Sequence, residues 1–164
     1  MRKFEKISFN SFKNQVTDNI DLYNSILIPK RSTKHSAAYD IRSVEEVTIP
    51  SGESRIINTG LKVCMNEDEV LYLYSRSSFG YKYDVCLTNC VGVIDSDYYN
   101  NDDNEGHIKV KLSNNGSKDF AINKGDRIAQ GVFMKYLTVD DEEEVTNIRS
   151  GGLGSTGKGD EINE

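Results

Sequence analysis

The sequence lacks the features that mark membrane, exported and nucleic-acid-binding proteins. No apolar run approaches the ~20 residues that a membrane-spanning helix needs. The basic residues at the N-terminus are not followed by the apolar stretch of a secretory signal, so we expect none. The chain also lacks an excess of positive charge: the net charge is -6, whereas proteins that bind nucleic acid through its phosphates are usually basic. We therefore expect a cytoplasmic protein whose partners include neither nucleic acid nor a membrane.

The cysteines are too few and too irregularly spaced for a disulfide framework. Cys64, Cys86 and Cys90 are odd in number and form no Cys-x-x-Cys pair. This usage is typical of reduced thiols in a cytoplasmic protein. No neighbouring cluster completes a metal site, so we interpret Cys86 and Cys90 as small buried hydrophobes.

Short apolar stretches alternate with turn signals along most of the chain. Residues 108–112 alternate apolar side chains with lysine, which is the period of a half-buried strand, and Gly, Pro and Asn mark turns at 50–52 and 114–116. Many short strands favour an all-β fold such as a sandwich, jelly roll or barrel. We expect strands at 25–28, 44–49, 54–58, 61–63, 70–74, 107–112, 120–122 and 131–136, with short helices near 11–16 and 77–81.

The two ends of the chain differ in character from its middle. Residues 1–23 precede the first expected strand, so we interpret them as an extra N-terminal segment before a β domain of residues 24–146. Residues 147–164 are rich in Gly, Ser and charge and poor in apolar anchors. This composition predicts a flexible C-terminal arm.

Two polar clusters in the first half of the chain could carry chemistry. Asp40 stands between an aromatic and an aliphatic residue in a strand-like context, where a solvated strand position is the simpler interpretation. Arg76, Ser77 and Ser78 follow an apolar strand and could cradle a phosphate, because arginine offers a forked donor and hydroxyls add more. An ordinary helix N-cap explains them equally well.

Three further clusters follow, and each has a simpler alternative. Asp95 comes directly after the apolar residues 91–94, so it could be a partly desolvated general base or part of a turn. Residues 124–130 contain a Gly-Asp turn that re-enters a strand. Residues 149–157 combine glycines, hydroxyls and an arginine that could wrap polyphosphate, although the run lacks the ending of a P-loop.

Together and in this order, the five clusters resemble the homotrimeric dUTPase family over roughly residues 25–157. The most specific runs are Gly92–Tyr98, Gly125–Gln130 and Gly151–Gly157. The resemblance implies a jelly-roll-like distorted barrel that assembles as a homotrimer, with three chains contributing to each active site. It also implies Mg²⁺-assisted hydrolysis of dUTP to dUMP and pyrophosphate, which limits uracil in DNA and supplies dUMP for dTMP synthesis.

The resemblance further implies a role for each matching residue. Asp95 would activate the water that attacks the α-phosphorus, Arg76 would stabilise charge on the leaving side, and Asp40 would hold Mg²⁺ through its water shell. The residues implied to bind substrate are Ser77, Ser78 and Gln130 at the phosphates, Asn89, Gly92, Val93 and Ile94 around the uracil, Tyr98 under the deoxyribose, and Arg149, Leu153, Gly154, Ser155 and Thr156 in the closing arm.

The chain departs from the family pattern in two informative places. Leu153 stands where a phenylalanine usually stacks on the uracil, and the polar run 99–105 is longer than in compact members. Tyr99 of that run is a candidate to replace the missing ring. The run and the N-terminal segment are also candidate surfaces for a regulatory partner such as a repressor, although a solvated loop and a packing strand are the simpler interpretation.

A dCTP deaminase-like enzyme of the same fold is the alternative activity. Such an enzyme needs a carboxylate placed to work on the cytosine ring. Asp95 stands in the hydrolase position, and we find no matching deaminase glutamate motif. The sequence therefore favours the hydrolase.

Overall fold

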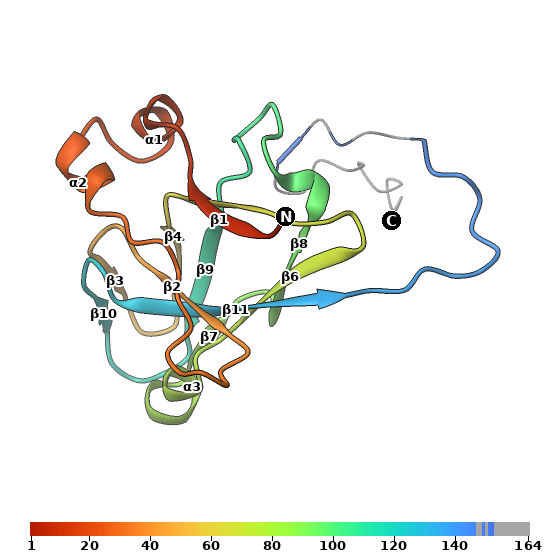
Figure 1. Ribbon diagram of the computed structural model, residues 1–164. Helices are drawn as coiled ribbons and strands as arrows, with labels where there is room; N and C mark the ends of the chain where they lie inside the picture. The colour runs from red at the N-terminus through yellow and green to blue at the C-terminus, as the bar shows by residue number, and fades with distance from the viewer. Residues whose placement is uncertain (147–148, 150, 153–164) are drawn as a thin grey trace, which may run out of the picture.

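The computed structural model of the chain describes residues 1–146, 149 and 151–152 (Figure 1). Within them, eleven short strands form four antiparallel sheets that do not close into a single barrel. The predicted all-β, distorted jelly-roll-like fold is confirmed. The strands are β1 (Lys3–Lys6), β2 (Tyr39–Arg42), β3 (Val47–Ile49), β4 (Ser54–Asn58), β5 (Leu61–Cys64), β6 (Glu69–Tyr74), β7 (Val85–Leu87), β8 (Val91–Asp95), β9 (Lys109–Asn114), β10 (Phe120–Ile122) and β11 (Arg127–Lys135).

The central sheet has the strand order β2-β11-β6-β8. Gln130 of β11 lies opposite Asp40 on β2 and opposite Tyr74 on β6. On the other side of β6, Gly92 of β8 lies opposite Leu73. The predicted site segments therefore occupy adjoining strands of one sheet.

Alternating side chains on the strands build the core. On β9, Val110 and Leu112 are buried while Lys111 between them is exposed, as the sequence period predicts. Apolar burial of this kind is the main favourable contribution to folding. The largest fully buried apolar side chains are Phe12, Ile7, Ile41, Ile49, Ile57, Leu61, Leu71, Ile108, Leu112 and Ile128.

The N-terminal segment packs into the same core. β1 pairs with β5, and helix α1 (Phe9–Gln15) begins at Ser8, whose hydroxyl accepts a hydrogen bond from the Ser11 amide at 3.1 Å. Phe12 of α1 is fully buried. This segment is therefore a packing element of the domain.

The strand expected at residues 25–28 is wrong. Only Ile26 is buried there, while Leu27 and Ile28 are exposed, and Pro29 has no backbone N–H to donate to a ladder. The first strand is β1, which the sequence reasoning missed because it pairs far along the chain with β5.

The two expected helices are confirmed, and one more is present. They are α1 and α3 (Ser77–Tyr83), and a helix α2 (Ile20–Asn24), capped by Asn19, lies between α1 and β2. A 3₁₀ turn, η1 (Ser96–Tyr98), follows β8. None of the helices in the described residues has the length and apolar character that crossing a bilayer requires.

The three cysteines are free thiols, as expected, but their burial differs from the prediction. Cys64 and Cys86 are partly buried, whereas Cys90 is exposed. Cys90 lies in the turn between β7 and β8 with φ of 60°, so its side chain leaves the sheet instead of entering the core. The interpretation of Cys90 as a buried hydrophobe is wrong.

Candidate active site

Asp40 is a buried carboxylate held at one end of the central sheet. Its Oδ2 accepts hydrogen bonds from the Ser32 hydroxyl at 2.7 Å and from Arg127 Nη1 at 3.2 Å. Burial acts to raise the pKa of Asp40, but the bonds from Ser32 and Arg127 outweigh it and leave the pKa below its ordinary value. Asp40 is therefore ionised and positioned, and the interpretation as a solvated strand residue is wrong.

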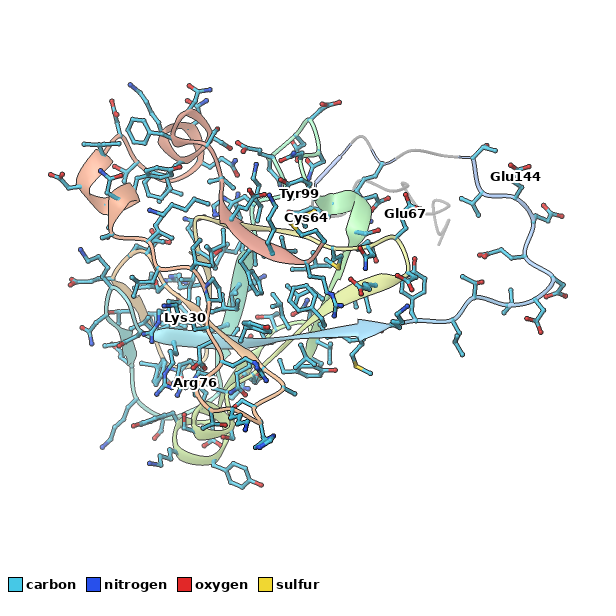
Figure 2. The ribbon with its side chains drawn as sticks, in the orientation of Figure 1. Lys30, Cys64, Glu67, Arg76, Tyr99 and Glu144 are labelled. Carbon is cyan, nitrogen blue, oxygen red and sulfur yellow. The ribbon has the colours of Figure 1, made fainter. Side chains whose placement is uncertain are left out.

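Three arginines gather beside it. Arg42, Arg76 and Arg127 line an open groove of about 580 Å³ together with Ser78 and Asp126. Arg76 Nη1 donates to the Arg127 carbonyl at 3.1 Å, and Figure 2 shows Arg76 beside α3 at this end of the sheet. Three guanidinium groups lining a groove with one carboxylate favour a ligand with several negative charges.

The serines before and within α3 do not cap that helix. Arg76 is the N-cap residue and its side chain makes no capping bond, while Ser75 Oγ accepts from the Leu87 amide at 2.7 Å. The simple N-cap interpretation is therefore wrong. Within the described part of the chain, the hydroxyls of Ser77 and Ser78 make no hydrogen bond, so they can serve an added ligand.

The sequence reasoning missed Arg42 and gave no role to Arg127. Arg42 is two residues after Asp40 on β2, so both side chains lie on one face of the strand, and that period was available from the sequence. Arg127 stands in the Gly-Asp-Arg run, where its turn context concealed its contact with Asp40.

A second pocket, of about 160 Å³, lies along β8 and η1. Tyr98 is 7% exposed there, and its hydroxyl donates to the His107 carbonyl at 3.0 Å. Gly92 permits close packing, since a Cβ at this position would lie 3.1 Å from Leu73 Cβ. The structure thus brings together most of the predicted residues of the hairpin segment, residues 89–98. The lining of this hairpin pocket is Leu73, Asn89, Gly92, Val93, Ile94, Asp95, Tyr98, Ile108, Lys109, Arg149 and Gly152.

Arg149 lies against the two acids of this pocket. Its Nη2 donates to Asp95 Oδ2 at 2.6 Å and its Nε to Asp97 Oδ1 at 2.8 Å. The guanidinium carbon is 5.9 Å from the centre of the Tyr98 ring. The resemblance implies that arm and hairpin come from different chains, whereas in this single chain Arg149 contacts its own hairpin.

The two clusters lie at different ends of the sheet. On β6, Tyr74 pairs with Gln130 of the arginine side, while Asp95 pairs with Val70. Four residues of extended strand span about 13 Å. One chain therefore does not bring Asp95 to the arginine groove.

Gln130 lies beside Asp40 in the register of the central sheet. Tyr99 does not line the pocket: its hydroxyl donates to the Glu5 carboxylate, and Figure 2 shows it near β1. It therefore does not replace the missing phenylalanine in this chain. Leu153, Gly154, Ser155 and Thr156 lie outside the described residues.

The fold and its two clusters define a jelly-roll-like protein with a cationic groove at one end of the central sheet and a second, smaller pocket at the other. The family model that matches is dUTPase, over residues 24–158. The chain belongs to the dUTPase family.

Known relatives agree with this assignment. The chain is 53% identical over 133 residues to a deoxyuridine 5'-triphosphate nucleotidohydrolase of Lactococcus lactis, covering 80% of this chain and 89% of that protein. It is 36% identical over 141 residues to the enzyme of the same name from Nautilia profundicola, covering 84% and 95%.

Solved structures show the same fold. The crystal structure of dUTPase from Streptococcus mutans matches with a TM-score of 0.71 and 42% identity over 84% of this chain and 98% of that chain. A mutant dUTPase from Staphylococcus aureus phage phi11, whose structure details the coordination of a structural Mg(II) ion, matches with a TM-score of 0.66 and 23% identity over 92% and 99%. At that identity the second match supports the fold alone.

Proposed function

We propose that the chain hydrolyses dUTP to dUMP and pyrophosphate in a site assembled between chains. The observation that carries the proposal is its 53% identity to a deoxyuridine 5'-triphosphate nucleotidohydrolase over most of both chains. The three free thiols fit a reducing compartment, so we place the reaction in the cytoplasm. There it limits uracil in DNA and supplies dUMP.

On the phosphate side, the arginine groove receives the triphosphate. Arg76 stabilises charge on the leaving pyrophosphate, and Ser77, Ser78 and Gln130 donate to phosphate oxygens. The geometry that supports this is the open groove beside Asp40 with unengaged serine hydroxyls. Arg42 and Arg127 extend the positive surface on the same side.

Mg²⁺ fits this site as a partner of the substrate. In the described part of the chain, no group of three or more His, Cys, Asp or Glu is placed to hold a metal alone. Asp40 keeps Oδ1 unengaged in the described residues while Oδ2 is bonded, which suits an outer-shell role with phosphate oxygens as inner ligands. Bound there, the ion would neutralise phosphate charge.

On the nucleoside side, the hairpin pocket receives uracil and deoxyribose. Asn89 and the backbone of residues 92–94 form hydrogen bonds with the uracil edge. Cytosine is rejected because its different donor pattern would leave polar groups unpaired in this pocket. Tyr98 presents its ring to the sugar and leaves no room for a ribose 2'-hydroxyl. Asp95 takes the proton of the water that attacks the α-phosphorus.

The two sides meet between subunits of a homotrimer. Asp95 and the arginine groove are about 13 Å of strand apart in one chain, too far to act on one phosphorus. Ile56 and Val93 expose 56% and 60% of their surface on the hairpin side, and such apolar surface is suited to cover by another chain. Figure 1 shows the chain after β11 leaving the body in a wide excursion. Leu137, two residues after β11, is exposed.

A pyrophosphate-release assay with Mg²⁺ across deoxynucleoside and ribonucleoside triphosphates tests the proposal. We expect release from dUTP far above release from dCTP, dTTP and UTP. Ammonia released from dCTP without pyrophosphate would instead establish a deaminase, and equal release from every nucleotide would remove the assigned specificity.

A further inference from the structure

Residues 99–106 form a packed loop rather than the solvated loop that their polar composition predicts. Asn101 and Asn104 are each 8% exposed. Asn101 Oδ1 accepts from the amides of Asp103 and Asn104, and its Nδ2 donates to the Tyr98 carbonyl at 2.8 Å. Asparagine amides satisfy the buried backbone of this loop, which is how a polar segment can pack tightly.

Asn104 holds the Tyr98 ring. Its Nδ2 donates to the Tyr98 hydroxyl at 2.8 Å, and that hydroxyl donates onward to the His107 carbonyl at 3.0 Å. A phenol that both accepts and donates a bond in a buried site has its ring direction fixed. Tyr98 therefore enters the hairpin pocket at one set position.

Gln15 closes this network from the N-terminal segment. Its Nε2 donates to the Asn104 carbonyl at 3.1 Å, and its Oε1 lies 3.1 Å from His107 Nδ1. The Gly60 amide can only donate, and it lies 3.0 Å from His107 Nε2, so the proton is on Nδ1 and Nδ1 donates to Gln15. One side chain of α1 thus connects both residues that touch the Tyr98 hydroxyl.

Asn104 also contacts the C-terminal arm. Gly152 is buried, and a Cβ at this position would lie 2.7 Å from Asn104 Nδ2. The amide that holds Tyr98 is therefore the same group over which the arm passes. A shift of Asn104 would therefore change both the position of the Tyr98 ring and the packing of the C-terminal arm at Gly152.

We propose that Asn104 is a positioning residue that sets sugar selection by fixing Tyr98, with Gln15 holding Asn104 in place. The inference rests on the proposed function, in which the Tyr98 ring excludes the ribose 2'-hydroxyl. A ring that is free to tilt makes room for that hydroxyl. Loss of the Asn104 side chain therefore raises kcat/KM for UTP more than it lowers kcat/KM for dUTP.

The test compares kcat/KM for dUTP and UTP in Asn104→Ala and in Asp102→Ala. Asp102 is the matched control, because it lies exposed in the same loop and makes no side-chain hydrogen bond within the described residues. We expect the dUTP/UTP ratio to fall about tenfold in Asn104→Ala, as for loss of the one buried hydrogen bond that holds the Tyr98 hydroxyl, and to stay unchanged in Asp102→Ala. The bonds that Asn104 Oδ1 accepts from Asn101 and Gly106 are lost as well. In a Tyr98→Phe background, Asn104→Ala should add little to the change in the dUTP/UTP ratio, since both changes remove the bond between Asn104 Nδ2 and the Tyr98 hydroxyl.

A readout without nucleotide comes from hydrogen exchange of residues 99–106. Gln15→Ala should raise exchange there and lower the dUTP/UTP ratio in the same direction as Asn104→Ala. If Asn104→Ala does not fold, the Gln15→Ala variant still tests the inference. Hydrolysis of dUTP with an unchanged ratio in the folded variants would overturn this inference alone, whereas a wild type that hydrolyses no dUTP would overturn the proposed function and this inference with it.

Discussion

Asp95 is the general base of the proposed site, and its activity depends most on its surroundings. Its side chain is 52% exposed at the end of β8 and is bonded to Arg149. The sequence suggested a partly desolvated carboxylate, but a single chain leaves it open to water. A general base gains from a site that excludes water, so the covering must come from substrate, arm or a neighbouring chain.

Asp95→Asn should lower the rate of dUTP hydrolysis by roughly 10²- to 10⁴-fold while nucleotide binding persists, since the change keeps the shape and removes the base. Single-turnover kinetics and calorimetry measure the two effects separately. Asp97→Asn is the matched control, because Asp97 also bonds Arg149 but has no assigned proton transfer, and it should lose much less. A turnover of Asp95→Asn near that of Asp97→Asn would remove Asp95 from the role of base.

His107 makes stability depend on pH. Burial, aided by Lys109, lowers its pKa from 6.5 to about 4. Below pH 6.5 His107 binds a proton in the unfolded chain but stays neutral in the folded chain. The free energy of unfolding is therefore highest above pH 6.5 and decreases as the pH falls towards 4. At ~1.4 kcal/mol per pKa unit, the loss is about 3 kcal/mol.

Urea unfolding at a series of pH values measures this loss. The slope between pH 6.5 and 4 should shrink in His107→Gln, whatever the absolute stability of that variant. His35→Gln is the matched control, since His35 is the other histidine and lies exposed. An equal slope in wild type and His107→Gln would show that other groups govern the acid response.

The sequence located single residues best where they stand in a specific run. Asp95 and Tyr98 stand in one such run, and the structure places both on the lining of one pocket. Asp40 is bonded to Arg127, which lines the cationic groove. Asn104 and Gln15 could not be assigned, because their roles come from contacts between segments far apart in the chain. Composition alone favoured a solvated loop and could not reveal mutual satisfaction of buried amides.

At the scale of elements, most strands were predictable from their period, and the failures have local causes. Residues 25–28 are apolar enough for a strand but end at Pro29 and expose two of their side chains. β1 is held by its pairing with β5 and by the packing of Phe4 on Tyr39 and Phe133, and no local pattern reveals these long-range contacts. Two described residues of the C-terminal arm, Arg149 and Gly152, line the hairpin pocket.

Deleting residues 148–164 should leave a folded protein that binds dUTP weakly and hardly hydrolyses it. The deletion removes the Arg149 contact with Asp95, and all of the buried apolar core side chains in the described part of the chain lie outside it. We expect kcat to fall by roughly two orders of magnitude, as for loss of an electrostatic contact to the transition state. The control deletes only residues 158–164, beyond the Gly-rich run, and should change kcat little. A normal kcat in the longer deletion would show that the arm is only a linker.

At the scale of the whole molecule, the proposed reaction uses two clusters that one chain does not bring together. The protein should therefore be a homotrimer, with three times the 18.4 kDa of one chain. Light scattering at micromolar concentration measures the mass directly. A monomeric mass in an active preparation would contradict the shared site.

Subunit mixing shows whether the arginine groove and the hairpin of one active site come from different chains. Asp95→Asn removes the base, and Arg76→Ala breaks the arginine groove, so each variant alone should be nearly inactive. If groove and hairpin come from different chains, a mixed trimer of the two variants contains one intact site. Refolding them together in equal amounts should restore about a quarter of the wild-type rate, the share expected for random assembly of a three-fold ring. If the mixture stays as inactive as its separate components while wild-type chains refolded in the same way recover full activity, the site lies within one chain and the account is wrong.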